Sequence, residues 1–185
     1  MNTIITSREA ILKASQKLAL ETGLQSINIR GVAASCNVSI GSVYNYFPSK
    51  ADLMTATIEK VWKDIFHKAN QHRPPEGFVE CVVWLYNSIQ NGLTEHPTFF
   101  ALHSRSFAAE DKEKGRIAMD YYFTHMKKGL LQALSNDPKV RPDAFTQSFT
   151  QADFVDFIFI SVINMSTSQS KNCYTLTEII KRSIF

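Results

Sequence analysis

Residues 28–53 read NIRGVAASCNVSIGSVYNYFPSKADL, and this stretch decides how the chain folds. Asn28 is a favourable N-cap, and it precedes a short helix that we expect to run to about Cys36. Asn37 can adopt the left-handed backbone conformation that ends a helix and turns the chain. The pattern therefore predicts a short helix followed by a tight turn.

A second short helix follows this turn, capped by Ser39 and reaching Phe47, because Pro48 cannot continue it. Val43 and Phe47 lie four residues apart, so both can anchor one face of the helix in a core. Two short helices joined by a tight turn form a helix-turn-helix, which places its second helix in the major groove of DNA.

The opposite face of the second helix carries polar and aromatic side chains and no acidic one, as a surface that meets phosphates requires. Its residues are Ile40, Gly41, Ser42, Tyr44, Asn45 and Tyr46. Arg30 and Lys50 flank this face with positive charge. The start of the helix at Ser39 adds backbone N–H groups that suit a phosphate.

These residues resemble the DNA-binding module of TetR-type transcriptional regulators. The resemblance rests on residues 29–33, 37–47 and 49–53, and it covers about residues 7–55. Its most specific part is a glycine, a small hydroxyl residue, an aliphatic residue and a Tyr-X-Tyr-Phe run, with a lysine three residues later. Asn37 stands where the family usually has glycine, which does not threaten the fold because asparagine tolerates the left-handed conformation.

The resemblance implies a division of roles on this surface. Base contacts are implied for Arg30, Ile40, Gly41, Tyr44 and Asn45. Phosphate contacts are implied for Asn28, Ser39, Ser42, Tyr46 and Lys50. Ile40 stands where the family often has a polar residue, so it can touch a thymine methyl group but cannot hydrogen-bond to a base edge. The plainer alternatives are surface charges for Arg30 and Lys50 and a packing role for the two tyrosines.

Helical periodicity continues along the rest of the chain, and no strand pattern, repeat or low-complexity tract interrupts it. Before the module we expect a helix capped by Thr6 or Ser7 and ended by Gly23. After it we expect helices at about residues 50–71, 77–95, 98–108, 110–135, 142–168 and 175–183. The predicted fold class is all-α, with an N-terminal three-helix helix-turn-helix module, a C-terminal helical bundle and about nine helices.

Aromatic residues divide the chain into two parts. Of the 2 Trp, 6 Tyr and 13 Phe, only Tyr44, Tyr46 and Phe47 precede residue 53. We therefore predict a helix-turn-helix DNA-binding domain at residues 1–50 and a larger domain at residues 51–185. The family resemblance implies that the larger domain binds an effector and forms the dimer.

The helix expected at residues 142–168 is apolar on nearly every side, so we expect it to be buried on both faces. One face can pack on its own domain, and the other can meet a symmetry mate together with the last helix. The predicted dimer interface is Phe154, Ile158, Val162, Met165, Leu176 and Ile180. The alternative is a helix that is simply central in a monomer, although a single helix-turn-helix reads too few base pairs to be selective.

Aromatic side chains, a methionine and a few polar groups in the larger domain would suit a flat or lipophilic effector. The candidate pocket residues are Trp62, Phe66, Trp84, Asn87, Phe100, His103, Tyr122, Met126 and Phe159. The alternative is that these aromatic stripes at helical spacing are ordinary core.

Composition and motifs exclude other classes of protein. With 44% hydrophobic residues, 20% charged residues and a net charge of +3, the chain is neither disordered nor polybasic. Three scattered cysteines and five histidines without ligand spacing favour neither a disulfide framework nor a metal site. GxSxG, HExxH and P-loop motifs are missing, so we expect no enzyme activity and no cofactor. Without a secretory pattern or a run of about 20 apolar residues, we expect a cytoplasmic protein.

Taken together, the sequence predicts a ligand-responsive transcriptional regulator, most simply a repressor, that binds a palindromic operator as a dimer. Its expected partners are double-stranded DNA, a second copy of the chain and a small apolar or aromatic effector, with no membrane. The first alternative is a DNA-bound adaptor that binds a protein partner and has no small-molecule effector. The second is a helical ligand-binding protein or enzyme with a vestigial N-terminal module.

Overall fold

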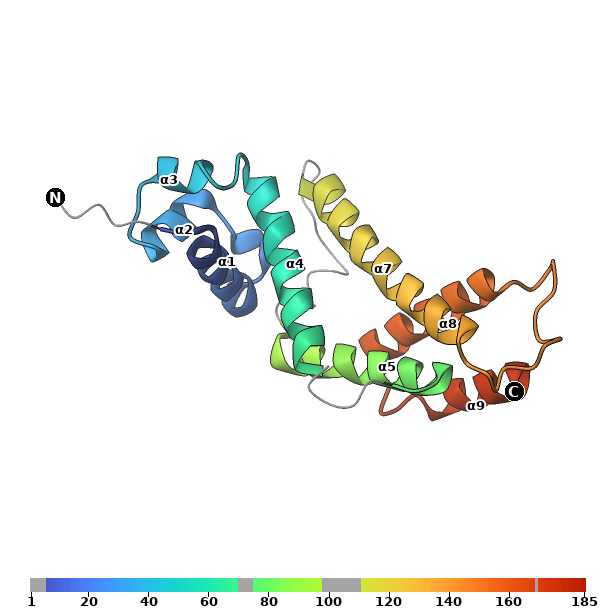
Figure 1. Ribbon diagram of the computed structural model, residues 1–185. Coiled ribbons are helices and arrows are strands. Elements are labelled where there is room, and N and C mark those ends of the chain that lie inside the picture. Colours follow the sequence, from blue (N-terminus) through green and yellow to red (C-terminus); the bar gives the residue numbers. More distant parts are fainter. Residues whose placement is uncertain (1–5, 70–74, 98–110, 169) are drawn as a thin grey trace. The chain divides into compact units, whose positions relative to one another are not determined.

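The computed structural model describes residues 6–69, 75–97, 111–168 and 170–185 (Figure 1). Within these ranges the chain forms eight α helices and one 3₁₀ helix, with no β strand, so the predicted all-α class is confirmed. The bounds are α1 Arg8–Thr22, η1 Leu24–Ser26, α2 Ile29–Ser35, α3 Ile40–Tyr44, α4 Lys50–Ala69, α5 Phe78–Glu95, α7 Asp111–Ser135, α8 Gln151–Thr167 and α9 Tyr174–Ile184. The helix expected at residues 98–108 lies outside the described residues.

The chain divides into two compact units, and the division falls inside α4. The first unit is Met1–Asp64 with Gly92–Tyr122, and the second is Ile65–Asn91 with Phe123–Phe185. None of the helices in the described ranges is both long enough and apolar enough to span a membrane. The functional boundary predicted at residue 50 stays a prediction, because compactness and function need not divide a chain at the same place.

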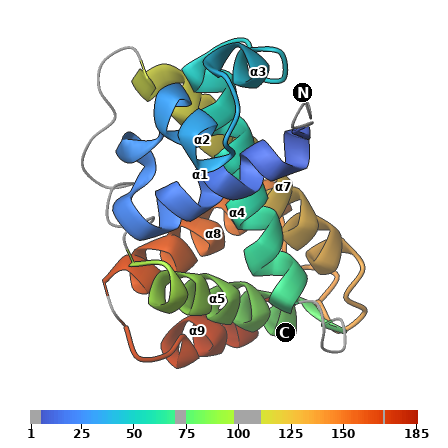
Figure 2. The same ribbon diagram turned by 90° about the vertical axis from the view of Figure 1, so that its left-hand side faces the viewer.

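In the first unit, α1, α2 and α3 gather beside the first part of α4 (Figure 2). Ser7 caps α1 by accepting the Ala10 N–H at 3.1 Å, and Gly23 ends it with a φ of 91°. A buried hydrogen bond of 2.7 Å joins the hydroxyls of Ser15 on α1 and Thr57 on α4. Both side chains are fully buried, so this bond is shielded from water and holds α1 against α4.

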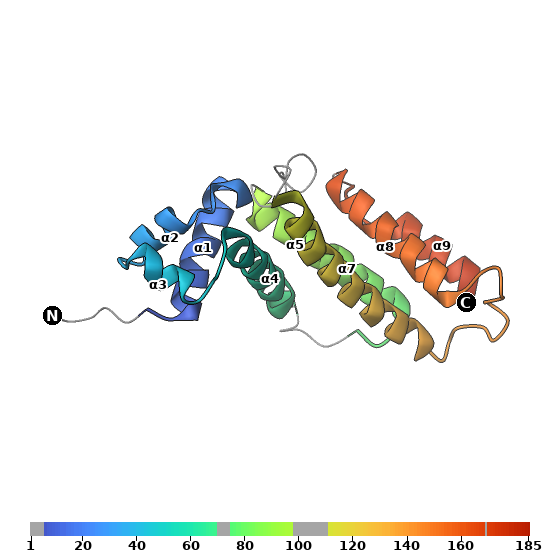
Figure 3. The ribbon, with the colours of Figure 1, turned by 90° about the horizontal axis from the view of Figure 1, so that it is seen from above.

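In the second unit, α5, the later part of α7, α8 and α9 lie alongside one another (Figure 3). The start predicted for α8 is wrong, because the helix begins at Gln151 and not near residue 142. Residues 136–150 form turns instead, and the Thr150 hydroxyl caps α8 by accepting the Asp153 N–H at 3.1 Å. The rings of Phe145 and Phe149 stack at 5.6 Å and both contact Phe154, which ties these turns to α8.

The side chains predicted to form the dimer interface point into the second unit itself. Five of them, Phe154, Ile158, Val162, Leu176 and Ile180, expose 5% or less of their surface, and Met165 is half-buried. A side chain without exposed surface cannot touch a partner, so the sequence assigned the inner face of α8 to the interface. The exposed apolar side chains of α8 are Phe157 and Ile160, and those of α9 are Tyr174 and Ile179. That these two helices form a dimer contact stays a prediction.

Asp137 fixes the start of α5 from a distant part of the chain. Its Oδ2 accepts the buried Phe78 N–H at 2.9 Å, and its Oδ1 accepts the Lys139 N–H at 3.0 Å. A Cβ atom at Gly77 would lie 2.9 Å from the same Oδ2. A carboxylate at this position also interacts favourably with the dipole of α5, so one side chain caps the helix and holds the turns after α7.

We predict that Asp137→Ala lowers the free energy of unfolding by about 1–2 kcal/mol, because it leaves the buried Phe78 N–H without an acceptor. Urea denaturation followed by circular dichroism measures this change. Asp143→Ala is the matched control, because Asp143 is exposed and its side chain forms, among the described residues, only an ion pair with Arg141 at 4.0 Å and no hydrogen bond. Equal unfolding midpoints for the two variants would contradict the capping role.

Candidate nucleic-acid interface

The structure presents the predicted recognition face to solvent. Ile40, Tyr44 and Tyr46 expose 43%, 48% and 41% of their surface, and Gly41 and Asn45 are exposed as well. On the opposite side Val43 and Phe47 are buried, as the four-residue spacing predicts. The regular helix α3 ends at Tyr44, three residues earlier than expected, and a turn continues to Tyr46.

A tight turn sets the direction of α3 relative to α2. Asn37 has a φ of 54°, which confirms the left-handed conformation expected there. The Val38 N–H donates to the Ala33 carbonyl at 3.0 Å, so the chain leaves α2 and reverses at once. Ser39 then caps α3 by accepting the Ser42 N–H at 3.1 Å, which confirms the predicted cap.

Several residues with implied phosphate contacts already make hydrogen bonds inside the chain. Asn28 caps α2 by accepting the Gly31 N–H at 2.7 Å, and its Nδ2 donates to the Ser26 carbonyl at 2.9 Å. The hydroxyls of Ser39 and Ser42 lie 2.9 Å apart. These side chains therefore stabilise the starts of α2 and α3, whether or not they also bind phosphates.

The positively charged residues of this face differ in their surroundings. Arg30 on α2 is exposed, and among the described residues no carboxylate or hydrogen-bond partner contacts it. Lys50 at the start of α4 is half-buried. No acidic residue occurs between residues 22 and 51, so the surface around α3 carries no negative side chain of its own segment.

The N-terminal segment of the chain touches the end of this recognition segment. The Tyr46 phenol donates to the Thr6 carbonyl at 2.9 Å, and the Arg8 guanidinium lies 5.0 Å from the centre of the Phe47 ring. Neither contact can be predicted from local sequence patterns, because Thr6 and Tyr46 lie 40 residues apart in the chain.

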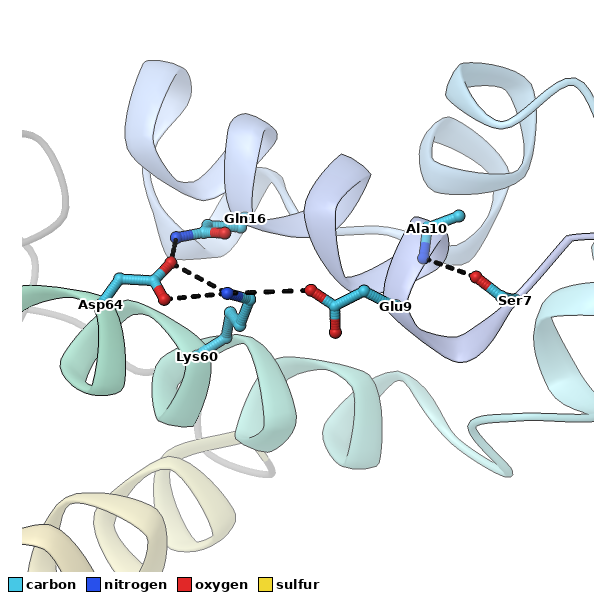
Figure 4. A network of polar contacts seen from close by, with 6 residues as sticks. All are labelled: Ser7, Glu9, Ala10, Gln16, Lys60 and Asp64. Carbon is cyan, nitrogen blue, oxygen red and sulfur yellow. Dashed lines mark hydrogen bonds and ion pairs between the residues drawn. The ribbon is translucent and has the colours of Figure 1, made fainter. Parts of the chain in front are cut away.

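A polar network joins α1 to α4 (Figure 4). The Gln16 amide donates to Asp64 at 2.7 Å, and the Lys60 ammonium lies 2.8 Å from Asp64 and 3.8 Å from Glu9. The hydrogen bond with Asp64 raises the pKa of Lys60 above its usual value, so Lys60 stays charged. The i, i+4 spacing of Lys60 and Asp64 is visible in the sequence, but the partners on α1 are not.

Cys36, the cysteine of the module, is a packing residue. Its thiol points at the Ala10 carbonyl, with 3.8 Å between Sγ and the oxygen. Burial raises the pKa of the Cys36 thiol above its usual value, which disfavours the reactive thiolate. Among the residues that the structure describes, no group of three or more His, Cys, Asp or Glu side chains could hold a metal ion.

The candidate pocket residues are divided between the two compact units. Trp62 and Tyr122 are buried in the first unit. Burial is the main reason that the pKa of Tyr122 rises to about 12. The second unit holds Phe66, Trp84, Asn87, Met126 and Phe159. Within it the rings of Phe66 and Trp84 lie 5.5 Å apart, whereas Asn87 is exposed. Phe100 and His103 lie outside the described residues, so the pocket stays a prediction.

Comparison with known sequences identifies the module. Residues 11–57 match the sequence model of a family described as "Bacterial regulatory proteins, tetR family". The chain is 27% identical over 123 residues to the HTH-type transcriptional repressor KstR of Rhodococcus jostii (strain RHA1), covering 63% of this chain and 57% of that protein. It is 31% identical over 64 residues to the KstR of Mycobacterium tuberculosis, covering 35% and 29%. The chain thus spans little more than half the length of the first of these relatives.

Solved structures show the same fold over nearly the whole chain. The transcriptional regulator FadR of Bacillus subtilis, in complex with stearoyl-CoA, superposes with a TM-score of 0.57 at 15% identity and covers 94% of this chain and 95% of its own. The multidrug binding protein EbrR, complexed with imidazole, superposes with a TM-score of 0.60 at 18% identity and covers 96% and 89%. At these identities the likeness is one of fold.

We predict that Asn37→Ala lowers the free energy of unfolding by about 1 kcal/mol and that Asn37→Gly does not lower it, because alanine is strained in the left-handed region that asparagine and glycine tolerate. Thermal and urea unfolding measure both variants. Asn45→Ala is the matched control, since Asn45 is also exposed but has a helical φ of −63°. If Asn37→Ala is no less stable than Asn45→Ala, the turn is not what holds α3 in place.

Proposed function

We propose that this chain, whose residues 11–57 belong to the TetR family of bacterial regulatory proteins, is a ligand-responsive transcriptional regulator that binds operator DNA as a homodimer. The observation that carries the proposal is the exposed, acid-free face of α3, backed by the buried Val43 and Phe47. Repression is the favoured direction of control, because the curated relatives that resemble it are named as repressors.

On this surface, Arg30 and the exposed face of α3 read base edges. A guanidinium can pair with the O6 and N7 atoms of guanine, and an asparagine amide such as that of Asn45 can pair with adenine. Ile40, Gly41 and Tyr44 complete the base-facing set, with Ile40 suited to a thymine methyl group. In this proposal Lys50 and the capped start of α3 at Ser39 and Ser42 hold phosphates, and Asn28 supports them by capping α2.

We predict that Arg30→Ala and Asn45→Ala each relax base preference at one position of the half-site, with a loss of about 1–3 kcal/mol in discrimination. Lys50→Ala weakens binding to all sequences and lowers the salt slope by about 1. Selection of bound sites from random duplex DNA, followed by titrations at several salt concentrations, measures both effects. Lys17→Ala is the control, because Lys17 is exposed on α1 and lies 3.9 Å from Glu21. If all three variants bind like the control, α3 is not the recognition surface.

The dimer contact of this proposal uses the outer face of α8 and α9. Phe157 and Ile160 expose 58% and 57% of their surface, and Ile179 on α9 exposes 47%. An isologous contact would cover the same patch on both copies, which removes these apolar side chains from water. Two copies would then place their recognition helices about 34–36 Å apart, in successive major grooves of a palindromic operator.

We predict that Phe157→Asp combined with Ile160→Asp converts the dimer to a monomer and lowers operator affinity, because four carboxylates would face one another across the contact. Sedimentation equilibrium measures the assembly state, and circular dichroism checks that the helices remain. Lys139→Asp, at an exposed position in the turns after α7, is the control and stays dimeric. A parent chain that is monomeric when bound to its site would instead favour an adaptor with a protein partner on this face.

The proposed effector is a lipophilic or aromatic small molecule bound by the larger part of the chain. Support comes from the apolar side chains there and from the fold shared with FadR, which was solved with stearoyl-CoA. α4 is continuous from Lys50 to Ala69, so it leads from the module into the second unit. An effector can change DNA binding only if it binds the two conformations of the regulator with unequal affinity.

A further inference from the structure

Residues 6–8, which precede or begin α1, are attached to the end of the recognition segment at two points. The Tyr46 phenol donates a hydrogen bond of 2.9 Å to the Thr6 carbonyl. Two residues further along the chain, the Arg8 guanidinium lies 5.0 Å from the centre of the Phe47 ring, within the range of a cation–π contact. The adjacent residues Tyr46 and Phe47 make these two contacts, so together they hold residues 6–8 beside the turn that follows α3.

The first contact changes the role that the sequence implies for Tyr46. A phenol has one proton to donate, and phosphate oxygens only accept hydrogen bonds. Because the Tyr46 proton is directed at the Thr6 carbonyl, the same hydroxyl cannot donate to a phosphate in this arrangement. Tyr46 therefore holds residues 6–8 next to α3.

The second contact leaves Arg8 free to bind an anion. The residue is exposed, and among the described residues no carboxylate pairs with it. Its neighbour Glu9 faces Lys60 on α4, 3.8 Å away, so that acidic side chain is already paired (Figure 4). A guanidinium that rests on an aromatic ring keeps its five N–H donors available, and its planar fork matches a phosphate.

We propose that Arg8 is a further DNA-binding residue of this surface, which contacts a backbone phosphate beside α3, and that Tyr46 is the positioning residue that fixes the segment carrying it. The inference rests on the proposed DNA-binding function and deepens it. It adds one phosphate contact to the surface and moves the role of Tyr46 from DNA to the protein's own N-terminal segment.

Salt dependence tests the phosphate contact directly. Arg8→Ala should make the negative slope of log K against log salt shallower by about 0.9, which is the value for one phosphate contact. The change should be the same with operator and with random duplex DNA. Between 50 and 200 mM salt the parent should therefore lose about 3.5-fold more affinity than the variant. Arg8→Lys should keep the parent slope. Lys13→Ala is the matched control, because it removes one positive charge from an exposed position on the same helix and should keep the parent slope too.

A double-mutant cycle tests the positioning role of Tyr46. Tyr46→Phe removes only the hydroxyl, so it should lower affinity severalfold in the parent and have no further effect when Arg8 is already alanine. Its unfolding midpoint, compared with that of the parent, separates lost stability from lost positioning. Additive losses in the two backgrounds would show that the hydroxyl acts independently of Arg8, which overturns the positioning role.

The outcomes separate this inference from the proposed function. If the parent binds no duplex DNA even at low salt, the proposed function fails and the inference fails with it. If Lys50→Ala lowers the salt slope while Arg8→Ala keeps the parent slope, the chain is a DNA binder and Arg8 does not contact a phosphate. The inference is supported if Lys50→Ala and Arg8→Ala both weaken the salt dependence while Lys13→Ala keeps that of the parent.

Discussion

The recognition surface depends on the burial of Val43 and Phe47. α3 has only five residues, and a helix of that length is not stable in water without tertiary contacts. Two apolar side chains on one side hold it against the rest of the module, and the helical period then turns Tyr44 and Asn45 toward solvent. The same burial places Phe47 where Arg8 can rest on its ring. The packing of the buried face of α3 thus determines which side chains its exposed face presents to solvent.

The parts of the fold that the sequence predicts are those set by local interactions. The caps at Ser7, Asn28 and Ser39 each bond to a backbone N–H three residues later, so the residue types alone predict them. The left-handed turn at Asn37 follows from the same local chemistry. For this reason the sequence predicts the module and its exposed face in some detail.

The parts that the sequence does not predict depend on contacts between distant residues. α8 is apolar on nearly every side, so its periodicity cannot say which face packs on its own unit and which meets solvent. The side chains predicted for the dimer contact lie on the face that is buried within the unit. The turns that precede the start of α8 at Gln151 are held by the rings of Phe145 and Phe149, which contact the Phe154 ring in tilted and edge-on arrangements. Asp137, which caps α5 from 59 residues away, and Gln16, which bonds to Asp64, likewise have no local signal.

In the proposed function, the contacts between α1 and α4 would determine how a movement of α4 changes DNA binding. The buried Ser15–Thr57 hydrogen bond and the Gln16–Asp64 bond fix α1 along the part of α4 that ends where the first compact unit ends. α1 in turn carries Arg8, and Tyr46 ties the start of the chain to the recognition segment. In the proposed function, a displacement of α4 would carry α1 with it, and the residues proposed to contact bases and phosphates would move together. All of the proposed contacts to DNA would then weaken together, so a small movement of one helix would produce a large change in affinity.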